Sequence, residues 1–175
     1  DLSQDILWRV VSADKSFRGL VAVTTHTVSE ICAKQKTDLT ATVALGRLLT
    51  GGALMAGLLK GRQRLSLAVE ASGPIGRMAV EADAQGRLRG TIRNPVPGLP
   101  PRANRFDVAG AIGKAGFLTV TKDLGLKKPY QSMVQLQTGE VGEDLAWYLS
   151  SSEQVPSSLG LGVEFNRAGD IAAAG

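Results

Sequence analysis

The stretch from Leu39 to Lys60, LTATVALGRLLTGGALMAGLLK, constrains the fold of this 175-residue chain more than any other. Apolar or small residues recur along it at helical spacing: Leu45, Leu48, Leu49, Gly52, Met55, Ala56 and Leu59. Leu54 and Leu58 make the opposite face apolar too. A helix that is apolar on nearly all sides must be buried on nearly all sides. We therefore predict a central buried helix over residues 39–60, which Asp38 can cap and Gly61 can end.

Within this stretch, the run from Ala41 to Leu59 is long enough to cross a lipid bilayer, and it carries one charge, Arg47. Four glycines and two threonines dilute its hydropathy, however, and no second run of this kind occurs in the chain, which disfavours a membrane protein. The glycines at positions 46, 51, 52 and 57 each lower the intrinsic helix stability by about 1 kcal/mol relative to alanine. We expect neighbouring elements to approach the helix closely at these positions.

Alternating apolar and polar residues predict antiparallel strands on both sides of this helix. The expected strands are a hairpin over 6–11 and 17–24, a meander over 65–70, 78–83 and 87–93, a pair over 117–122 and 130–138, and a last strand over 159–165. Shorter helices are expected near 27–36 and 141–150, with a short helix or turn at 107–114, a proline-rich loop at 94–104, and no closing element after residue 170. Strands and helices are segregated, so the predicted class is α+β in a single domain.

Composition indicates a folded protein of a reducing compartment. Apolar residues make up 43% of the chain, which is typical of globular domains. Cys32 is the one cysteine, so an intramolecular disulfide is excluded, and the first residues do not resemble a secretory signal. We therefore expect a cytoplasmic location.

The middle of the chain is strongly basic. Residues 60–128 carry 13 basic and 5 acidic side chains, a net charge of +8, whereas the whole chain carries +4. Such a segment can bind nucleic acid or another acidic partner. Its arginines mostly alternate with apolar residues, which favours a solvated strand face. Base stacking also needs exposed aromatic rings, and we expect Phe106 and Phe117 to lie in the core.

Residue types that support catalysis or metal binding are scarce. A tetrahedral zinc site takes four Cys, His or carboxylate ligands at suitable spacing, but the chain has one cysteine and one histidine, Cys32 and His26. We expect Cys32 to be a small core residue and His26 to be structural. The run from Gly46 to Gly51 resembles half of a phosphate-binding loop, yet Gly52 and Ala53 replace the required Lys and Ser/Thr. We therefore predict no catalytic residue, and a protein that is not an enzyme.

Several short motifs occur in an order and spacing that together are specific. They include Ala44-Leu45-Gly46-Arg47-Leu48-Leu49, Gly73-Pro74, Asn94-Pro95, Lys122-Asp123-Leu124-Gly125, Pro129-Tyr130, Gly139-Glu140, Ser152-Glu153-Gln154 and Pro156-Ser157. With these motifs the chain resembles, over nearly its whole length, the redox-regulated bacterial chaperone family known as the thirty-three-kilodalton heat-shock protein.

The resemblance implies an ATP-independent holdase that binds unfolding proteins during oxidative and heat stress. It also implies three parts: an N-terminal core, a linker, and a C-terminal domain in which four cysteines bind zinc. In that family, oxidation of the cysteines forms disulfides, releases zinc and exposes the binding surface. This chain holds none of the four cysteines, so residues 1–175 correspond to the core, ahead of the linker and the zinc domain. We expect no cofactor or metal in this chain, and the formation of a homodimer stays open.

Three functions are therefore compared. A chaperone core needs exposed apolar surface with adaptable side chains, and the candidate client-binding residues are Met133, on an outward strand face, and Trp147, off the apolar stripe of the 141–150 helix. A nucleic-acid-binding domain predicts binding that falls steeply with salt. An enzyme predicts a concave pocket with convergent polar groups and perturbed pKa values. The resemblance favours the chaperone core.

Overall fold

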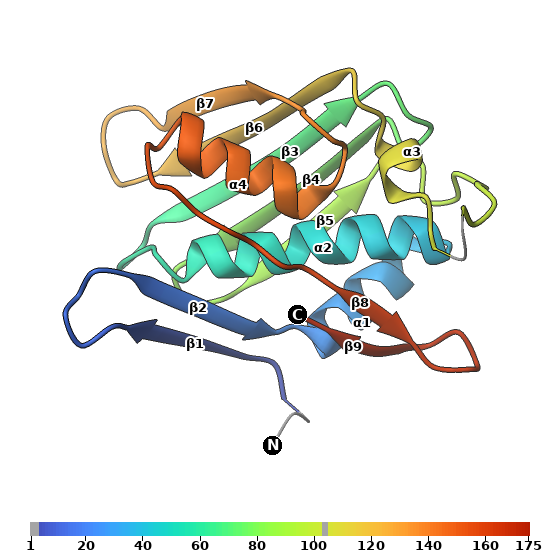
Figure 1. Ribbon diagram of the computed structural model, residues 1–175, viewed down its shortest axis with the longest axis horizontal. Helices are drawn as coiled ribbons and strands as arrows, with labels where there is room; N and C mark the ends of the chain where they lie inside the picture. Colours follow the sequence, from blue (N-terminus) through green and yellow to red (C-terminus); the bar gives the residue numbers. More distant parts are fainter. Residues whose placement is uncertain (1–3, 103–104) are drawn as a thin grey trace.

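Residues 4–102 and 105–175 are described by the structure, a computed structural model of the chain (Figure 1). The elements within these ranges are β1 (Ile6–Val11), β2 (Arg18–Val23), α1 (Thr25–Gln35), α2 (Leu39–Ala56), β3 (Arg64–Ala71), β4 (Arg77–Asp83), β5 (Leu88–Ile92), α3 (Val108–Ile112), β6 (Gly116–Asp123), β7 (Tyr130–Gln135), α4 (Val141–Ser151), β8 (Val163–Phe165) and β9 (Ile171–Ala174). The predicted α+β class is confirmed. In Figure 1, α2 crosses the molecule, with the large sheet on one side and two small hairpins on the other.

The central helix α2 forms because its apolar surface can be buried on nearly all sides. Asp38 caps it as predicted, since its carboxylate accepts a hydrogen bond from the Ala41 N–H at 2.8 Å. The helix ends at Ala56 rather than at the predicted Lys60. The Leu58 and Leu59 N–H groups turn back onto carbonyls only three residues earlier, which tightens the chain into a turn. Gly61 does adopt the left-handed conformation, with φ of 57°, but in the turn that follows the helix.

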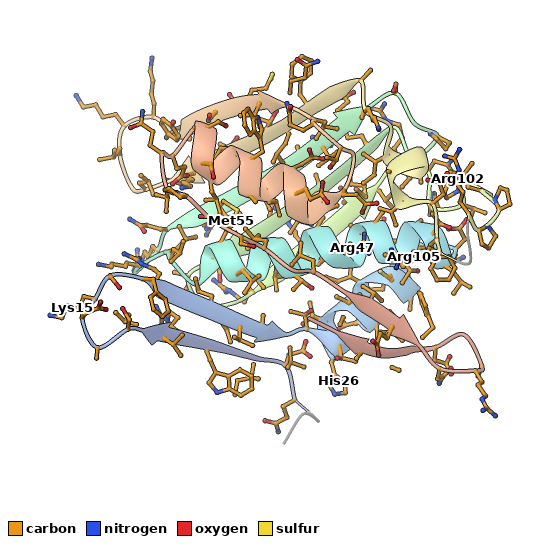
Figure 2. All side chains as sticks on the ribbon, viewed as in Figure 1. Lys15, His26, Arg47, Met55, Arg102 and Arg105 are labelled. Carbon is orange, nitrogen blue, oxygen red and sulfur yellow. The ribbon has the colours of Figure 1, made fainter. Side chains whose placement is uncertain are left out.

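By length and composition alone, α2 is long and apolar enough to cross a membrane. In the fold, however, 78% of this segment is buried inside the protein. Its one charged residue, Arg47 (labelled in Figure 2), forms an ion pair with Glu140 just before α4, at 2.7 Å between Nη1 and Oε2. The helix is therefore the core helix that the sequence predicts.

The glycines of α2 lie where other elements come close, as expected. A Cβ added at Gly46 would lie 2.9 Å from Val28 of α1, and one at Gly52 would lie 2.8 Å from Val80 of β4. Both distances are shorter than a van der Waals contact. The loss of helix propensity is thus the cost of packing α1 and the sheet directly against the backbone of α2.

The five-stranded sheet has the order β5-β4-β3-β6-β7, and every neighbouring pair is antiparallel. The predicted meander β3-β4-β5 is confirmed. The segment that contains α3 then leads from the β5 edge back to the free side of β3, where β6 pairs. Residues 103–104 of the predicted loop lie outside the described residues. Leu65, Leu67 and Val69 of β3 point into the core under α2, so the other face of the sheet is left open.

The end of the chain closes the core, contrary to expectation. The strand predicted over 159–165 covers only Val163–Phe165, and residues 171–174 form β9, which pairs with it. The Thr24 N–H donates a hydrogen bond to the Ala174 carbonyl at 2.9 Å, which fixes β9 beside the end of β2. Phe165 packs edge-on against Phe106, with ring centroids 5.4 Å apart. The sequence did not predict β9 because its alanines show no alternation of polarity.

Candidate functional site

The two candidate contact residues, Met133 and Trp147, are both exposed, with 58% and 46% of their surface accessible. They lie on different surfaces. Met133 is on β7 and points away from the core, because its neighbour Val134 packs against the core on the other face. Trp147 is on α4, which covers the inner face of the same sheet. The structure therefore does not bring these two residues together into one site.

Met133 belongs to an open surface on the sheet whose central side chains are uncharged, with Asp123 at the end of β6 and Glu70, opposite Phe117, at its border. We call this surface the β6–β7 outer face; it consists of Phe117, Thr119, Thr121, Gln131, Met133 and Gln135. Thr119 lies directly opposite Met133 and next to Ala68, which is followed across the sheet by Ala79. The side chains that extend across the sheet from the exposed methionine are therefore small.

Phe117 corrects one of the predictions. It was expected in the core but is 50% exposed, because the period-two alternation of β6 places Leu118 and Val120 inside. Phe106 is partly buried against the core, as expected. The sequence alternation of Phe117 with Leu118 places it on the outward face, but its apolar side chain suggested burial.

Charged side chains occupy the other half of the same sheet face and are paired there. Arg89 of β5 forms an ion pair with Glu81 of β4. Glu70 of β3 lies 3.4 Å from Arg93 and 3.8 Å from Arg77. Exposed pairs of this kind contribute little to stability, but they partly neutralise the basic middle of the chain where it faces solvent.

The hairpin of β1 and β2 provides a second exposed apolar surface, which the sequence analysis did not identify. Its outer face consists of Ile6, Trp8, Val10 and Val21, each more than one third exposed. Its inner face turns toward α2, where Leu7 and Leu20 lie against Gly57. The tip of this hairpin carries Lys15, labelled in Figure 2, and the exposed Phe17. Because both faces of β1 are apolar, the alternation that would have marked the exposed face is missing.

The end of α4 is tied to β6 by a half-buried polar cluster. Glu153 accepts a hydrogen bond from the Tyr148 hydroxyl at 2.7 Å and pairs with the Lys122 ammonium group. Burial opposes the ionisation of Glu153, but the hydrogen bonds from Lys122 and Tyr148 outweigh it and keep the Glu153 pKa below its ordinary value. Burial, together with the neighbouring Glu153, raises the pKa of Tyr148. The tyrosine therefore stays protonated. The cluster joins the end of α4 to β6 and has a structural role.

The residues present do not fit a zinc site. Cys32 is buried on α1, and burial raises its pKa to about 11 against the opposing hydrogen bonds of Thr37 and Thr42. His26 lies at the exposed start of the same helix (Figure 2), where its backbone N–H donates a hydrogen bond to the Asp5 carboxylate. Within residues 4–102 and 105–175, no group of three or more His, Cys, Asp or Glu side chains is placed to hold a metal ion.

A groove of about 380 Å³ lies between the hairpin, the end of α2 and the β4–β5 turn. Its volume is in the range of ligand pockets, but its polar side chains bind the backbone of the protein itself. Arg9 donates to the Gly57 carbonyl at 3.1 Å, Gln85 donates to the Gly61 carbonyl, and Asp5 accepts from the start of α1. These three polar side chains of the groove are thus engaged by the protein's own backbone.

Comparison with known proteins gives one consistent result. The family described as "Hsp33 protein" matches residues 5–175. The 33 kDa chaperonin of Syntrophotalea carbinolica is 55% identical over 172 residues, which cover 98% of this chain and 60% of that protein. The 33 kDa chaperonin of Geobacter sulfurreducens is 52% identical over 171 residues, covering 98% of this chain and 57% of that protein. A solved structure, the 33 kDa chaperonin (heat shock protein 33 homolog) of Thermotoga maritima, superimposes with a TM-score of 0.89 at 37% identity, over 96% of this chain and 58% of that one. The chain thus spans less than two thirds of the length of these relatives.

Proposed function

Because the chain belongs to the Hsp33 family, we propose that it is the client-binding core of an ATP-independent holdase. The observation that carries the proposal is the β6–β7 outer face, where Met133 and Phe117 are exposed among uncharged side chains on an otherwise folded core. A holdase must capture many sequences, which favours flat apolar surface and a flexible methionine over a shaped pocket. Met133 and Trp147 remain our proposed client contacts, on two separate surfaces.

The setting of this activity is part of the same proposal. We place the protein in the cytoplasm of a bacterium under oxidative or heat stress, with unfolding proteins as its partners. The zinc-binding redox switch and its disulfides are assigned to the part of the relatives that this chain does not span, because Cys32 is the one cysteine here. A homodimer is compatible with this assignment and is left to measurement.

Nucleic-acid binding is the alternative that the basic segment suggests. The arginines of β4 and β5 are paired with glutamates on the sheet surface, which weakens that case. The two functions differ in their response to salt. Client binding through apolar surface should vary little between 50 and 200 mM salt, whereas binding through several phosphate contacts should fall by orders of magnitude.

Replacing Met133 by glutamine should weaken client binding. Burying about half of the methionine side chain is worth about 1 kcal/mol, which corresponds to about fivefold in affinity. We therefore expect the Met133→Gln chain to need about fivefold more protein for half-maximal suppression of light scattering by a thermally unfolding client. Met133→Leu keeps the apolar surface and serves as the matched control, with suppression close to that of the parent chain.

The same assay on Trp147→Ser separates the two candidate surfaces. A loss with Met133→Gln alone assigns client binding to the β6–β7 outer face, and a loss with Trp147→Ser alone assigns it to α4. Unchanged suppression by both variants would refute both contact residues, although the holdase activity itself would stand.

A further inference from the structure

One edge of the β1–β2 hairpin is open. The Ser12 N–H donates to the Phe17 carbonyl at 3.0 Å, which sets the hydrogen-bonding phase of the two strands. By antiparallel alternation, the N–H and C=O groups of Leu7, Arg9 and Val11 then point away from β2. Within residues 4–102 and 105–175, β2 is the one strand that pairs with β1. These three residues therefore present an unpaired row of backbone donors and acceptors.

The β1 edge lacks the features that usually prevent strand pairing. Proteins protect edges with charges, prolines, bulges or covering segments. On the large sheet, the β5 edge carries Arg89 and Arg93. The outer edge of β2 is partly covered, because Thr24 is bonded to Ala174 of β9. The β1 strand, ILWRVV, has no proline and keeps an unbroken register with β2, and the guanidinium of its one charged residue, Arg9, is bonded to the Gly57 carbonyl.

An added strand would meet apolar surface on its outward side and a mixed polar and apolar surface on its inward side. Its outward side chains would lie beside Ile6, Trp8 and Val10, which are exposed on the outer face of the hairpin. Its inward side chains would lie beside Leu7 and Arg9 at the 380 Å³ groove, where Ala56 at the end of α2 lies together with the polar residues Asp83 and Gln85. The edge thus fits an extended segment that is apolar on its outward face and mixed on its inward face.

We propose that an extended segment of an unfolding client adds to β1 as a third, antiparallel strand. The inference rests on the proposed holdase function and names a site for it separate from Met133 and Trp147. Main-chain hydrogen bonds would supply affinity without regard to sequence, which suits a binder of many clients. A second copy of this chain is a less favourable occupant, because pairing two β1 strands about Arg9, the middle of the edge, would bring two arginines face to face.

Amide hydrogen exchange on the unmodified chain tests the proposal. In the free protein, the Leu7, Arg9 and Val11 amides should exchange quickly, and those of Trp8 and Val10, which face β2, slowly. With saturating reduced, carboxymethylated α-lactalbumin as the unfolded client, exchange at Leu7, Arg9 and Val11 should slow by at least about tenfold. Binding to side-chain surface alone would not produce this alternating pattern.

Two variants of one residue isolate the backbone contribution. Val11→Pro removes an edge donor that does not bond to β2, and Val11→Ala removes the side chain but keeps the donor. We expect the client-induced protection of Leu7 and Arg9 to disappear in Val11→Pro and to persist in Val11→Ala. Unchanged protection in Val11→Pro would overturn the proposal.

The remaining outcomes separate this inference from the proposed function. Suppressed aggregation without protection of the three amides would overturn strand addition and leave the holdase function intact. Protection that appears without client and grows with protein concentration would identify a second copy as the occupant, and would overturn the client site. No suppression of aggregation and no protection would refute both.

Discussion

Replacing Asp144 by alanine is expected to lower the free energy of unfolding by about 3–5 kcal/mol, because three buried backbone donors lose their acceptor at about 1–3 kcal/mol each. The Asp144 carboxylate is buried at the start of α4 and accepts three backbone hydrogen bonds. Its donors are the N–H groups of Gln137 at 2.7 Å, Thr138 at 3.1 Å and Gly139 at 3.0 Å. Removing the carboxylate leaves these donors without their partner and cuts the tie between α4 and the turn that precedes it.

Urea denaturation followed by circular dichroism measures this loss. Glu143→Ala is the matched control, since Glu143 is also an acidic residue in the first turn of α4 but is exposed. It should change the free energy of unfolding by no more than about 0.5 kcal/mol. An Asp144→Ala chain as stable as the Glu143→Ala chain would show that the three hydrogen bonds do not hold the turn.

Replacing Gly52 by leucine should destabilise the protein by about 3 kcal/mol. A Cβ at Gly52 would lie 2.8 Å from Val80 Cγ1, with Leu88 and Leu67 less than 4 Å away, so the rest of a leucine has no room. Helix propensity alone would favour leucine over glycine by about 0.8 kcal/mol. A loss of stability would therefore arise from packing and not from the helix itself.

Ala53→Leu provides the control at the adjacent position of α2. Ala53 is partly exposed and borders the groove, so a larger side chain has space there. We expect its change in the free energy of unfolding to stay within about 1 kcal/mol. If both variants had the same stability, the close approach of α2 and the sheet at Gly52 would not be what requires a glycine there.

Much of the fold follows from periodicity in the sequence. The period-two strands β3 and β4 and the start of α2 at Leu39 lie where the pattern places them. The pairing of β6 with β3 does not follow, because alternation gives the faces of a strand but not its neighbours. The alanine-rich strand β9 was missed for lack of alternation, and α2 was predicted four residues too long because Leu58 and Leu59 continue its apolar pattern into a turn.

The candidate site was predictable in part. Alternation with Val134 correctly places Met133 on the outward face of β7. Trp147 lies outside the apolar stripe of its helix, and it is exposed as that position predicts. Their separation depends on α4 covering the inner face of the sheet, which is a tertiary contact with no local signal. The open edge of β1 is likewise visible only once the strand order is known.

The most direct test of the central claim is light scattering by a thermally unfolding client, with and without this chain, in reductant and in peroxide. Cys32, the one cysteine, is buried with a pKa of about 11, so its thiol reacts little with peroxide. Peroxide also oxidises exposed methionines, so the Met133→Leu chain is measured beside the parent chain. We expect equal suppression of scattering under both conditions, because the client-binding surface belongs to this core. Suppression under neither condition, or only after peroxide treatment, would contradict it.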